Sequence, residues 1–137
     1  MTFRQTAVAY LATAVVFLAL DAVWLTTMAD RLYRPAIGHL MREPFAVGPA
    51  VLFYLVYVAG VVVFAVMPAL SSGRWTTALG FGALLGLLAY ATYDLTNQAT
   101  LKDWSWQVTI ADLCWGTIVT AVSAAAAARL TMAFGGR

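Results

Sequence analysis

Three aspartates, Asp21, Asp94 and Asp112, lie inside apolar stretches that are long enough to cross a membrane. A carboxyl group in the middle of a membrane-spanning helix costs roughly 2.5–3.5 kcal/mol on insertion scales. These stretches contain no Lys or Arg that could offset the cost. Acids in such positions commonly belong to ligand sites, ion paths or proton relays. The three aspartates are therefore the first candidates for a functional site.

Aromatic and amide side chains accompany the acids at helical spacing. Residues three or four apart share one face of a helix, which aligns Asp21 with Trp24 and Asp112 with Trp115. Asp94 aligns with Tyr90 and Asn97 in the same way. Asp-x-x-Trp thus occurs twice, although two short matches do not establish an internal repeat. The candidate ligand-binding residues are Asp21, Trp24, Tyr54, Tyr57, Tyr90, Tyr93, Asp94, Asn97, Asp112 and Trp115.

The elements that must position these residues follow from composition. The chain has 137 residues, of which 63% are hydrophobic and 10% charged, whereas about a quarter of a soluble domain is charged. A helix needs about 20 residues to cross a hydrocarbon core of about 30 Å. We therefore expect one all-α integral-membrane domain over residues 1–137, an antiparallel bundle of four transmembrane helices. The expected spans are 6–28, 49–67, 76–98 and 108–128.

Local signals predict where the spans begin and end. The first helix is expected to end at Asp30-Arg31, and residues 31–44 mix apolar side chains with arginines, which suits a short interfacial helix. The second helix is expected to stop at Pro68. Trp104 and Trp106 follow the third helix, at a depth where indole rings favour the membrane interface.

The alternating direction of the spans predicts where the polar residues meet. The end of the first helix, the start of the second, the end of the third and the start of the fourth must share one membrane face. Counting along each helix places the three aspartates and Tyr54 roughly 6–12 Å below that face. The opposite half consists mostly of Ala, Val, Leu and Gly, so the sequence predicts a polar layer on one side only.

Several kinds of chemistry are missing from the sequence. His39 is the only histidine, so no histidine pair is available for haem or zinc, and we expect no metal and no cofactor. Neither a Gly-x-Ser-x-Gly elbow nor a phosphate loop nor a Cys-x-x-Cys pair is present, and no catalytic residue is assigned. The net charge of +2 comes without a basic run, which argues against nucleic-acid binding.

Longer segments carry a resemblance to a known family. They are Leu20–Leu25, Phe53–Tyr57, Tyr90–Lys102 and Asp112–Gly116. On these segments the chain resembles, nearly end to end, a bacterial inner-membrane family with four predicted spans, domain of unknown function 2177. The Tyr-Asp-Leu-Thr-Asn segment is quite specific to that family. The resemblance implies the architecture and the inner membrane, and it implies no substrate or reaction.

The function is open between two main hypotheses. The polar layer is either a pocket that binds a small molecule, cation or lipid headgroup, or a packed network inside a small accessory subunit or assembly factor. Acids that point into a pocket would favour the first. A lipid-facing groove lined by the small residues of the third and fourth helices, open to a partner or a second copy, would favour the second. A lipid-modifying enzyme is a distant third, because no nucleophile–base pair is evident.

The orientation in the membrane depends on the basic residues. Those at the end with the termini are Arg4, Arg74, Arg129 and Arg137, and those at the other end are Arg31, Arg34, Arg42 and Lys102. The positive-inside rule is therefore balanced. We expect both termini to be cytoplasmic.

Overall fold

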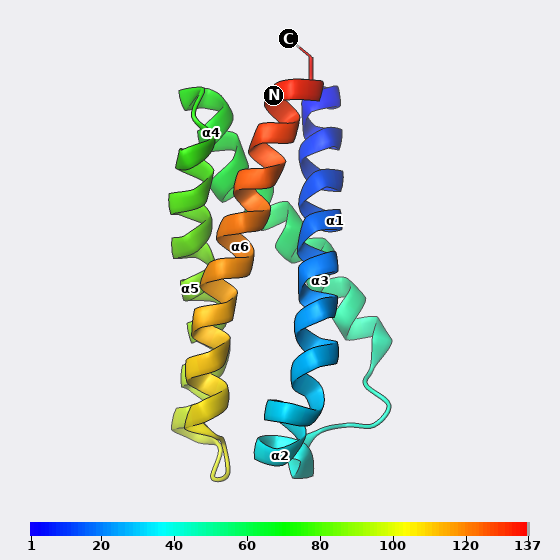
Figure 1. Ribbon diagram of the computed structural model, residues 1–137, viewed down its shortest axis with the longest axis vertical. Helices are drawn as coiled ribbons and strands as arrows, with labels where there is room; N and C mark the ends of the chain where they lie inside the picture. Colours follow the sequence, from blue (N-terminus) through cyan, green and yellow to red (C-terminus); the bar gives the residue numbers. More distant parts are fainter. Residues whose placement is uncertain (137) are drawn as a thin grey trace.

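The computed structural model of the protein describes residues 1–136 as four long helical segments without any β-strand among them (Figure 1). The first segment consists of α1 (Phe3–Met28), a π turn (Ala29–Tyr33), α2 (Arg34–Ile37) and a 3-10 turn (Gly38–Leu40). The second consists of α3 (Val47–Val61), a π turn (Val62–Val66) and α4 (Met67–Ser72). The third and fourth are α5 (Trp75–Thr100) and α6 (Trp106–Phe134).

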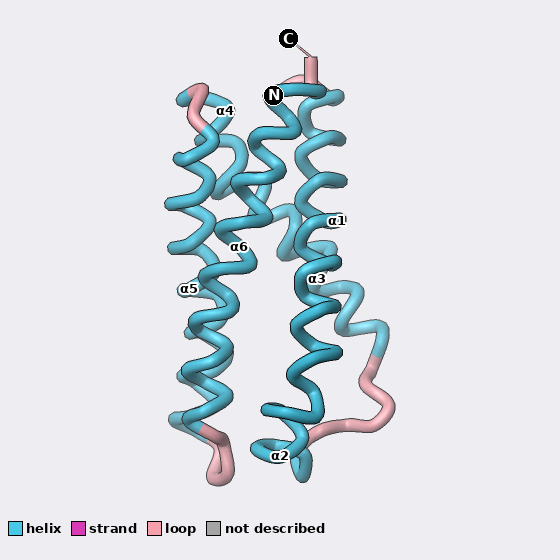
Figure 2. The backbone as a smooth tube through the Cα atoms, viewed as in Figure 1, coloured by secondary structure: helices cyan, strands magenta, loops and turns pink. Residues whose placement is uncertain are grey.

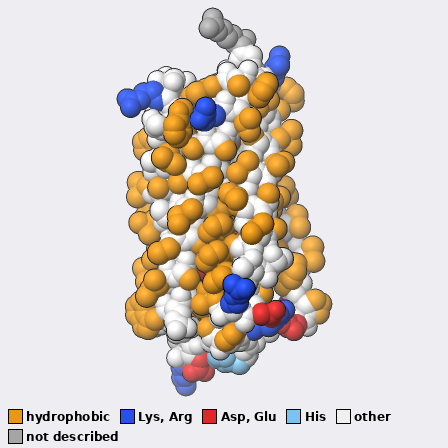
Figure 3. All heavy atoms as spheres, viewed as in Figure 1, with side chains coloured by type: hydrophobic (Ala, Val, Ile, Leu, Met, Phe, Trp, Pro, Cys, Tyr) orange, Lys and Arg blue, Asp and Glu red, His pale blue; other side chains and the backbone are white. Residues whose placement is uncertain are grey.

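Each segment is long and apolar enough to cross a membrane. A helix satisfies its own backbone hydrogen bonds, which is what the hydrocarbon core demands. Hydrophobic side chains cover the flanks, and the charged side chains visible in Figure 3 gather toward the two ends. Both termini lie at one end and α2 lies at the other (Figure 1). The prediction of an all-α bundle of four transmembrane helices is confirmed. Arg137, counted above for orientation, lies outside the described residues.

Glycines allow α5 and α6 to approach closely. A Cβ atom added to Gly86 would lie 2.1 Å from the Gly116 carbonyl oxygen, and one added to Gly82 would lie 2.9 Å from the Ala124 Cβ. No side chain fits in such a space, so backbone packs directly on backbone, as small residues permit in membranes. This contact makes α5 and α6 the tightest pair in the bundle and holds Asp94 against the start of α6.

The second segment crosses the bundle obliquely. Figure 2 shows α3 running at an angle to the other helices, with its N-terminal end set to one side. The π turn at Val62–Val66 packs against α5, while α3 itself packs against α1. The bundle is therefore closed at the end that carries the termini. Toward the other end, the path of α3 diverges from the remaining helices (Figure 2).

One predicted helix end was confirmed and one was wrong. The helix α1 ends at Met28, as the predicted span 6–28 does, and the π turn and the short α2 follow it where a short helix was expected. The second helical path continues past Pro68 to Ser72. Proline lacks an N–H and crowds the carbonyl four residues before it. The preceding π turn changes the bonding pattern in that place, and the chain stays helical.

The corner between α5 and α6 is tied to the first loop. Trp104 is buried in a small cluster with Ile37 and Val108, and its indole N–H donates to the Thr109 hydroxyl at 3.0 Å. Trp104 is therefore buried within the protein at this corner, whereas Trp106 is 62% exposed. The depth of the two rings at the membrane interface stays a prediction. This cluster anchors residues 29–41 over the end of the bundle.

Candidate functional site

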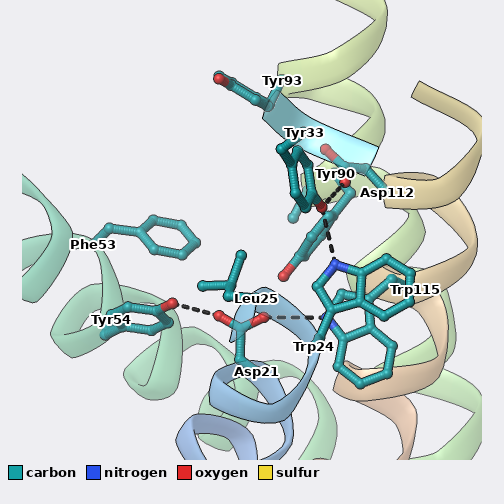
Figure 4. Close-up of a pocket in the computed structure, with 11 residues that line it drawn as sticks. Asp21, Trp24, Leu25, Tyr33, Phe53, Tyr54, Tyr90, Tyr93, Asp112 and Trp115 are labelled. Atoms are coloured by element: carbon teal, nitrogen blue, oxygen red, sulfur yellow. Dashed lines mark hydrogen bonds between the residues drawn. The ribbon is translucent and has the colours of Figure 1, made fainter. Parts of the chain in front are cut away.

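A pocket of about 420 Å³ lies where α3 diverges from the other helices (Figure 4). All four helical segments contribute to its wall. It is lined by Asp21, Trp24, Leu25, Tyr33, Phe53, Tyr54, Ala89, Tyr90, Tyr93, Asp112 and Trp115. Leu25, Phe53 and Tyr93 are 44%, 49% and 58% exposed, so they form a rim through which the pocket opens sideways.

The Asp21 carboxylate on α1 is held from two other helices. The Tyr54 hydroxyl of α3 donates to Oδ2, and the Trp115 indole N–H of α6 donates to Oδ1 at 3.1 Å. The side chain is buried. Each oxygen of the carboxyl group has a donor. Asp21 therefore ties three helices together and faces the pocket with little freedom to turn.

The Asp112 carboxylate on α6 is held in a related way. The Tyr33 hydroxyl donates to its Oδ1 at 2.5 Å and accepts from the Trp24 indole N–H at 2.9 Å. Figure 4 shows Tyr33 reaching between these two side chains. Tyr33 lies in the π turn after α1, so the first loop supplies the link between α1 and α6. Asp112 is buried as well.

The two Asp-x-x-Trp motifs meet in the site. The rings of Trp24 and Trp115 are stacked, with centroids 4.7 Å apart and planes at 5°. Each tryptophan is hydrogen-bonded to the aspartate of the other motif. Trp115 donates to Asp21 directly, whereas Trp24 donates to the Tyr33 hydroxyl, which in turn donates to Asp112. Since α1 and α6 run in opposite directions, the same four-residue pattern on both helices produces two carboxylates bridged by an aromatic stack.

Tyr90 forms another wall of the pocket. Its ring lies directly over Gly116, where an added Cβ would come within 2.2 Å of the ring. Its hydroxyl points into the pocket (Figure 4). Gly116 thus has a second role besides helix packing, since it makes room for a tyrosine beside the acids.

Most of the predicted site residues converge on this pocket. The pocket includes Asp21, Trp24, Tyr54, Tyr90, Tyr93, Asp112 and Trp115. Tyr57 does not line it, because its hydroxyl bonds to Thr120 at 2.8 Å and its ring packs on Phe17 in the core. Asp94 lies behind the wall, beside Asp112, and Asn97 lies outside the pocket lining.

Sequence reasoning missed Leu25, Tyr33, Phe53 and Ala89 as lining residues. Tyr33 matters most, because it is the donor to Asp112. Nine residues separate it from Trp24, which is two and a half turns of a regular helix and would place the two on opposite faces. The π turn changes that phase. The one available signal was the tyrosine itself in an otherwise arginine-rich segment.

The polar groups of the pocket wall are carboxyl groups and aromatic side chains. Among residues 1–136 no group of three or more His, Cys, Asp or Glu side chains is arranged to hold a metal ion. The pocket wall offers instead two carboxylates, two indoles and several phenols. Carboxylates bind positive charge, and the faces of aromatic rings attract cations. The arrangement is chemically suited to an organic cation with an apolar body.

Comparisons with known proteins leave one finding. No curated protein and no solved structure matches the chain. A family model described as a predicted membrane protein, DUF2177, matches residues 6–129. These residues include every residue of the pocket wall and the four membrane-spanning segments, except for a few residues at the start of the first and at the end of the fourth. The chain belongs to the DUF2177 family of membrane proteins.

Proposed function

We propose that the protein binds an alkylammonium group, as a free amine or as the headgroup of a lipid, in the pocket between α1, α3, α5 and α6. One observation carries the proposal. Two buried carboxylates, Asp21 and Asp112, lie in a wall made almost entirely of aromatic rings. Cations placed over such rings are stabilised by about 0.5–2 kcal/mol per ring, more when water is excluded.

The charge balance of the bundle supports a cationic ligand. Every Lys and Arg of the described residues is exposed, so no basic side chain is buried with the acids. An uncompensated carboxylate in the membrane region is costly. A positively charged ligand would offset this cost, whereas an anion would add to it. The pocket therefore selects by sign of charge before it selects by shape.

The rim supports an amphiphilic ligand. Leu25, Phe53 and Tyr93 come from α1, α3 and α5, and all three are apolar or aromatic and exposed on the flank of the bundle. A lipid could keep its chains in the bilayer while its headgroup enters between these helices. A free amine would use the same polar end without needing the rim. The shared chemistry is the ammonium group.

The accessory-subunit hypothesis would be favoured by a lipid-facing groove lined by the small residues of α5 and α6. Gly82, Gly86 and Gly116 are buried between α5 and α6, where the first two face the α6 backbone and the third faces the Tyr90 ring. They therefore do not line a groove that is open to a partner or to a second copy. This supports the binding hypothesis. A membrane-protein partner and a second copy of the chain stay the alternatives that the test below distinguishes from a small ligand.

The test compares lipids and free amines. The purified protein would be reconstituted in nanodiscs of phosphatidylglycerol with or without phosphatidylethanolamine, released into detergent and examined by native mass spectrometry. We expect retained phosphatidylethanolamine and no retained phosphatidylglycerol. Addition of ethanolamine should displace the lipid if the headgroup alone is recognised. The variant Asp112→Asn should retain less, and the surface variant Asp103→Asn should behave as wild type.

Other results would redirect the proposal. Equal retention of both lipids would show nonspecific association and would contradict a cation-selective pocket. If neither the lipids nor ethanolamine bind, the accessory-subunit hypothesis takes its place. We also propose the bacterial inner membrane with both termini in the cytoplasm, which labelling of single cysteines introduced at Thr2 and at Lys102, in a variant that lacks Cys114, would test in intact cells.

A further inference from the structure

Asp94 is the most deeply buried acid in the chain, and the pocket does not use it. Its side chain is 0% exposed. Both carboxyl oxygens are buried and receive no hydrogen bond from an N–H or O–H group of residues 1–136. A buried oxygen without a donor costs about 1–3 kcal/mol, and more if it carries charge. Asp94 thus differs from Asp21, whose oxygens both accept hydrogen bonds.

Another acid lies opposite Asp94 across the helix pair. Tyr90 of α5 lies over Gly116 of α6, so one turn further along the antiparallel pair Asp94 lies opposite Asp112, and the two acids interact. Two carboxyl groups can bond to each other only if one of them carries a proton, because an ionised carboxylate has no donor. Two carboxylates that touch in a dry interior cannot both be ionised. A contact between these two buried carboxyl groups therefore needs one proton between them.

No other charged group in the surroundings changes this requirement. Asp21 of α1 acts on Asp112 and adds negative charge, while Tyr33 and Tyr93 are neutral phenols near the pair. The π turn Val62–Val66 and α4, which also pack on α5, contain no titratable side chain. Every described Lys and Arg is exposed. No positive group replaces the proton.

We propose that Asp94 and Asp112 form a proton-binding site that holds one shared proton and releases it to water when a cation occupies the adjacent pocket. Asp112 belongs to both sites, because it lines the pocket and contacts Asp94. A cation beside Asp112 stabilises the fully ionised pair, so one positive charge enters as one leaves. The second half of this proposal rests on the proposed function.

Infrared difference spectroscopy of the purified full-length protein near neutral pH tests both halves. A protonated carboxyl has a carbonyl band that shifts in D₂O and that an ionised carboxylate lacks. We expect this band in the wild type and its loss in both Asp94→Asn and Asp112→Asn. The exposed acid Asp103, whose side chain is 72% exposed, gives the control variant Asp103→Asn, which should keep the band. Saturating tetramethylammonium should abolish the wild-type band.

Each outcome decides between the two halves. If the wild type has no such band, or if the band survives in both Asn variants, the proton site is wrong. If the band is present but does not change while tryptophan fluorescence shows that tetramethylammonium has bound, the coupling is wrong. If the band is present and tetramethylammonium does not bind, the proton site stands and the proposed function fails for this probe. The wild-type spectrum alone keeps the test valid should a variant fail to fold.

Discussion

Trp24 and Trp115 lie parallel with their ring centroids 4.7 Å apart, although they come from the first and last helices. Each indole N–H points away from the stack, one to Asp21 and the other to the Tyr33 hydroxyl. The stack therefore joins α1 to α6. It also orients the hydrogen bonds around Asp21 and those around Asp112. Offset aromatic pairs contribute about 0.5–1.5 kcal/mol beyond the area they bury.

The variant Trp115→Phe should distinguish the contribution of the aromatic stack to stability from that of the hydrogen bond to Asp21. Phenylalanine keeps an aromatic face against Trp24 but removes the donor to Asp21, which still accepts from Tyr54. We expect a loss of about 1 kcal/mol in the free energy of unfolding. Reversible denaturation in mixed detergent micelles would measure it. Trp106→Phe is the matched control, since Trp106 is 62% exposed, and a loss of the same size there would contradict the assignment.

Tyr33→Phe should cost more than one hydrogen bond. The hydroxyl both donates to Asp112 and accepts from Trp24, so its removal leaves two groups without partners. The expected loss is about 2–6 kcal/mol, from about 1–3 kcal/mol for each of the two unsatisfied groups. In the double variant with Asp112→Asn, the two effects should not add, because the residues share one network. Simple additivity in a double-mutant cycle would show that Tyr33 acts independently of Asp112.

Asp94→Leu and Asp21→Leu should have opposite effects on stability. No N–H or hydroxyl group of the described residues donates to Asp94, and Asp112, which we propose shares a proton with it, keeps its hydrogen bond from Tyr33, so leucine removes a buried acid without orphaning an N–H or a hydroxyl. We expect a midpoint of thermal denaturation equal to or above that of the wild type. Asp21→Leu orphans the Tyr54 hydroxyl and the Trp115 N–H, and should lower stability by about 2–6 kcal/mol, at about 1–3 kcal/mol per donor. Equal destabilisation by both variants would contradict the different environments of the two acids.

Gly86→Ala should separate α5 from α6. The added methyl would lie 2.1 Å from the Gly116 carbonyl oxygen, and backbone cannot move aside as a side chain can. Overpacking of this kind costs about 1–3 kcal/mol. Gly80→Ala is the matched control on the same helix, because nothing lies within 4 Å of its added Cβ. It should be neutral or stabilising, and a melting curve in which both variants unfold alike would count against the close contact.

The sequence predicts the architecture and most of the pocket. Counting residues from the helix ends was sufficient to bring Asp21, Asp94 and Asp112 to one face, because the rise per residue of a helix is constant. The segments that departed from prediction are those where this regularity fails. The π turn at Ala29–Tyr33 changes the helical phase and brings Tyr33 into the site, and the π turn at Val62–Val66 lets the chain continue past Pro68.

The residue that lies opposite Asp94 could not be predicted from the sequence either. Helical spacing paired it with Tyr90 and Asn97 on its own helix, whereas the structure places it against Asp112 of α6. That contact depends on how closely α5 approaches α6, which Gly82, Gly86 and Gly116 determine. Sequence spacing within one helix cannot specify the distance or rotation between two helices.

The central claim is that the pocket recognises positive charge within an aromatic wall. The most direct measurement is a tryptophan-fluorescence titration of the purified protein with choline and with 3,3-dimethyl-1-butanol, which has the same shape without the charge. We predict that choline binds at least about tenfold more tightly, equivalent to ~1.4 kcal/mol. The preference should disappear in the double variant Asp21→Asn, Asp112→Asn. Equal affinity of the two compounds for the wild type would contradict the account.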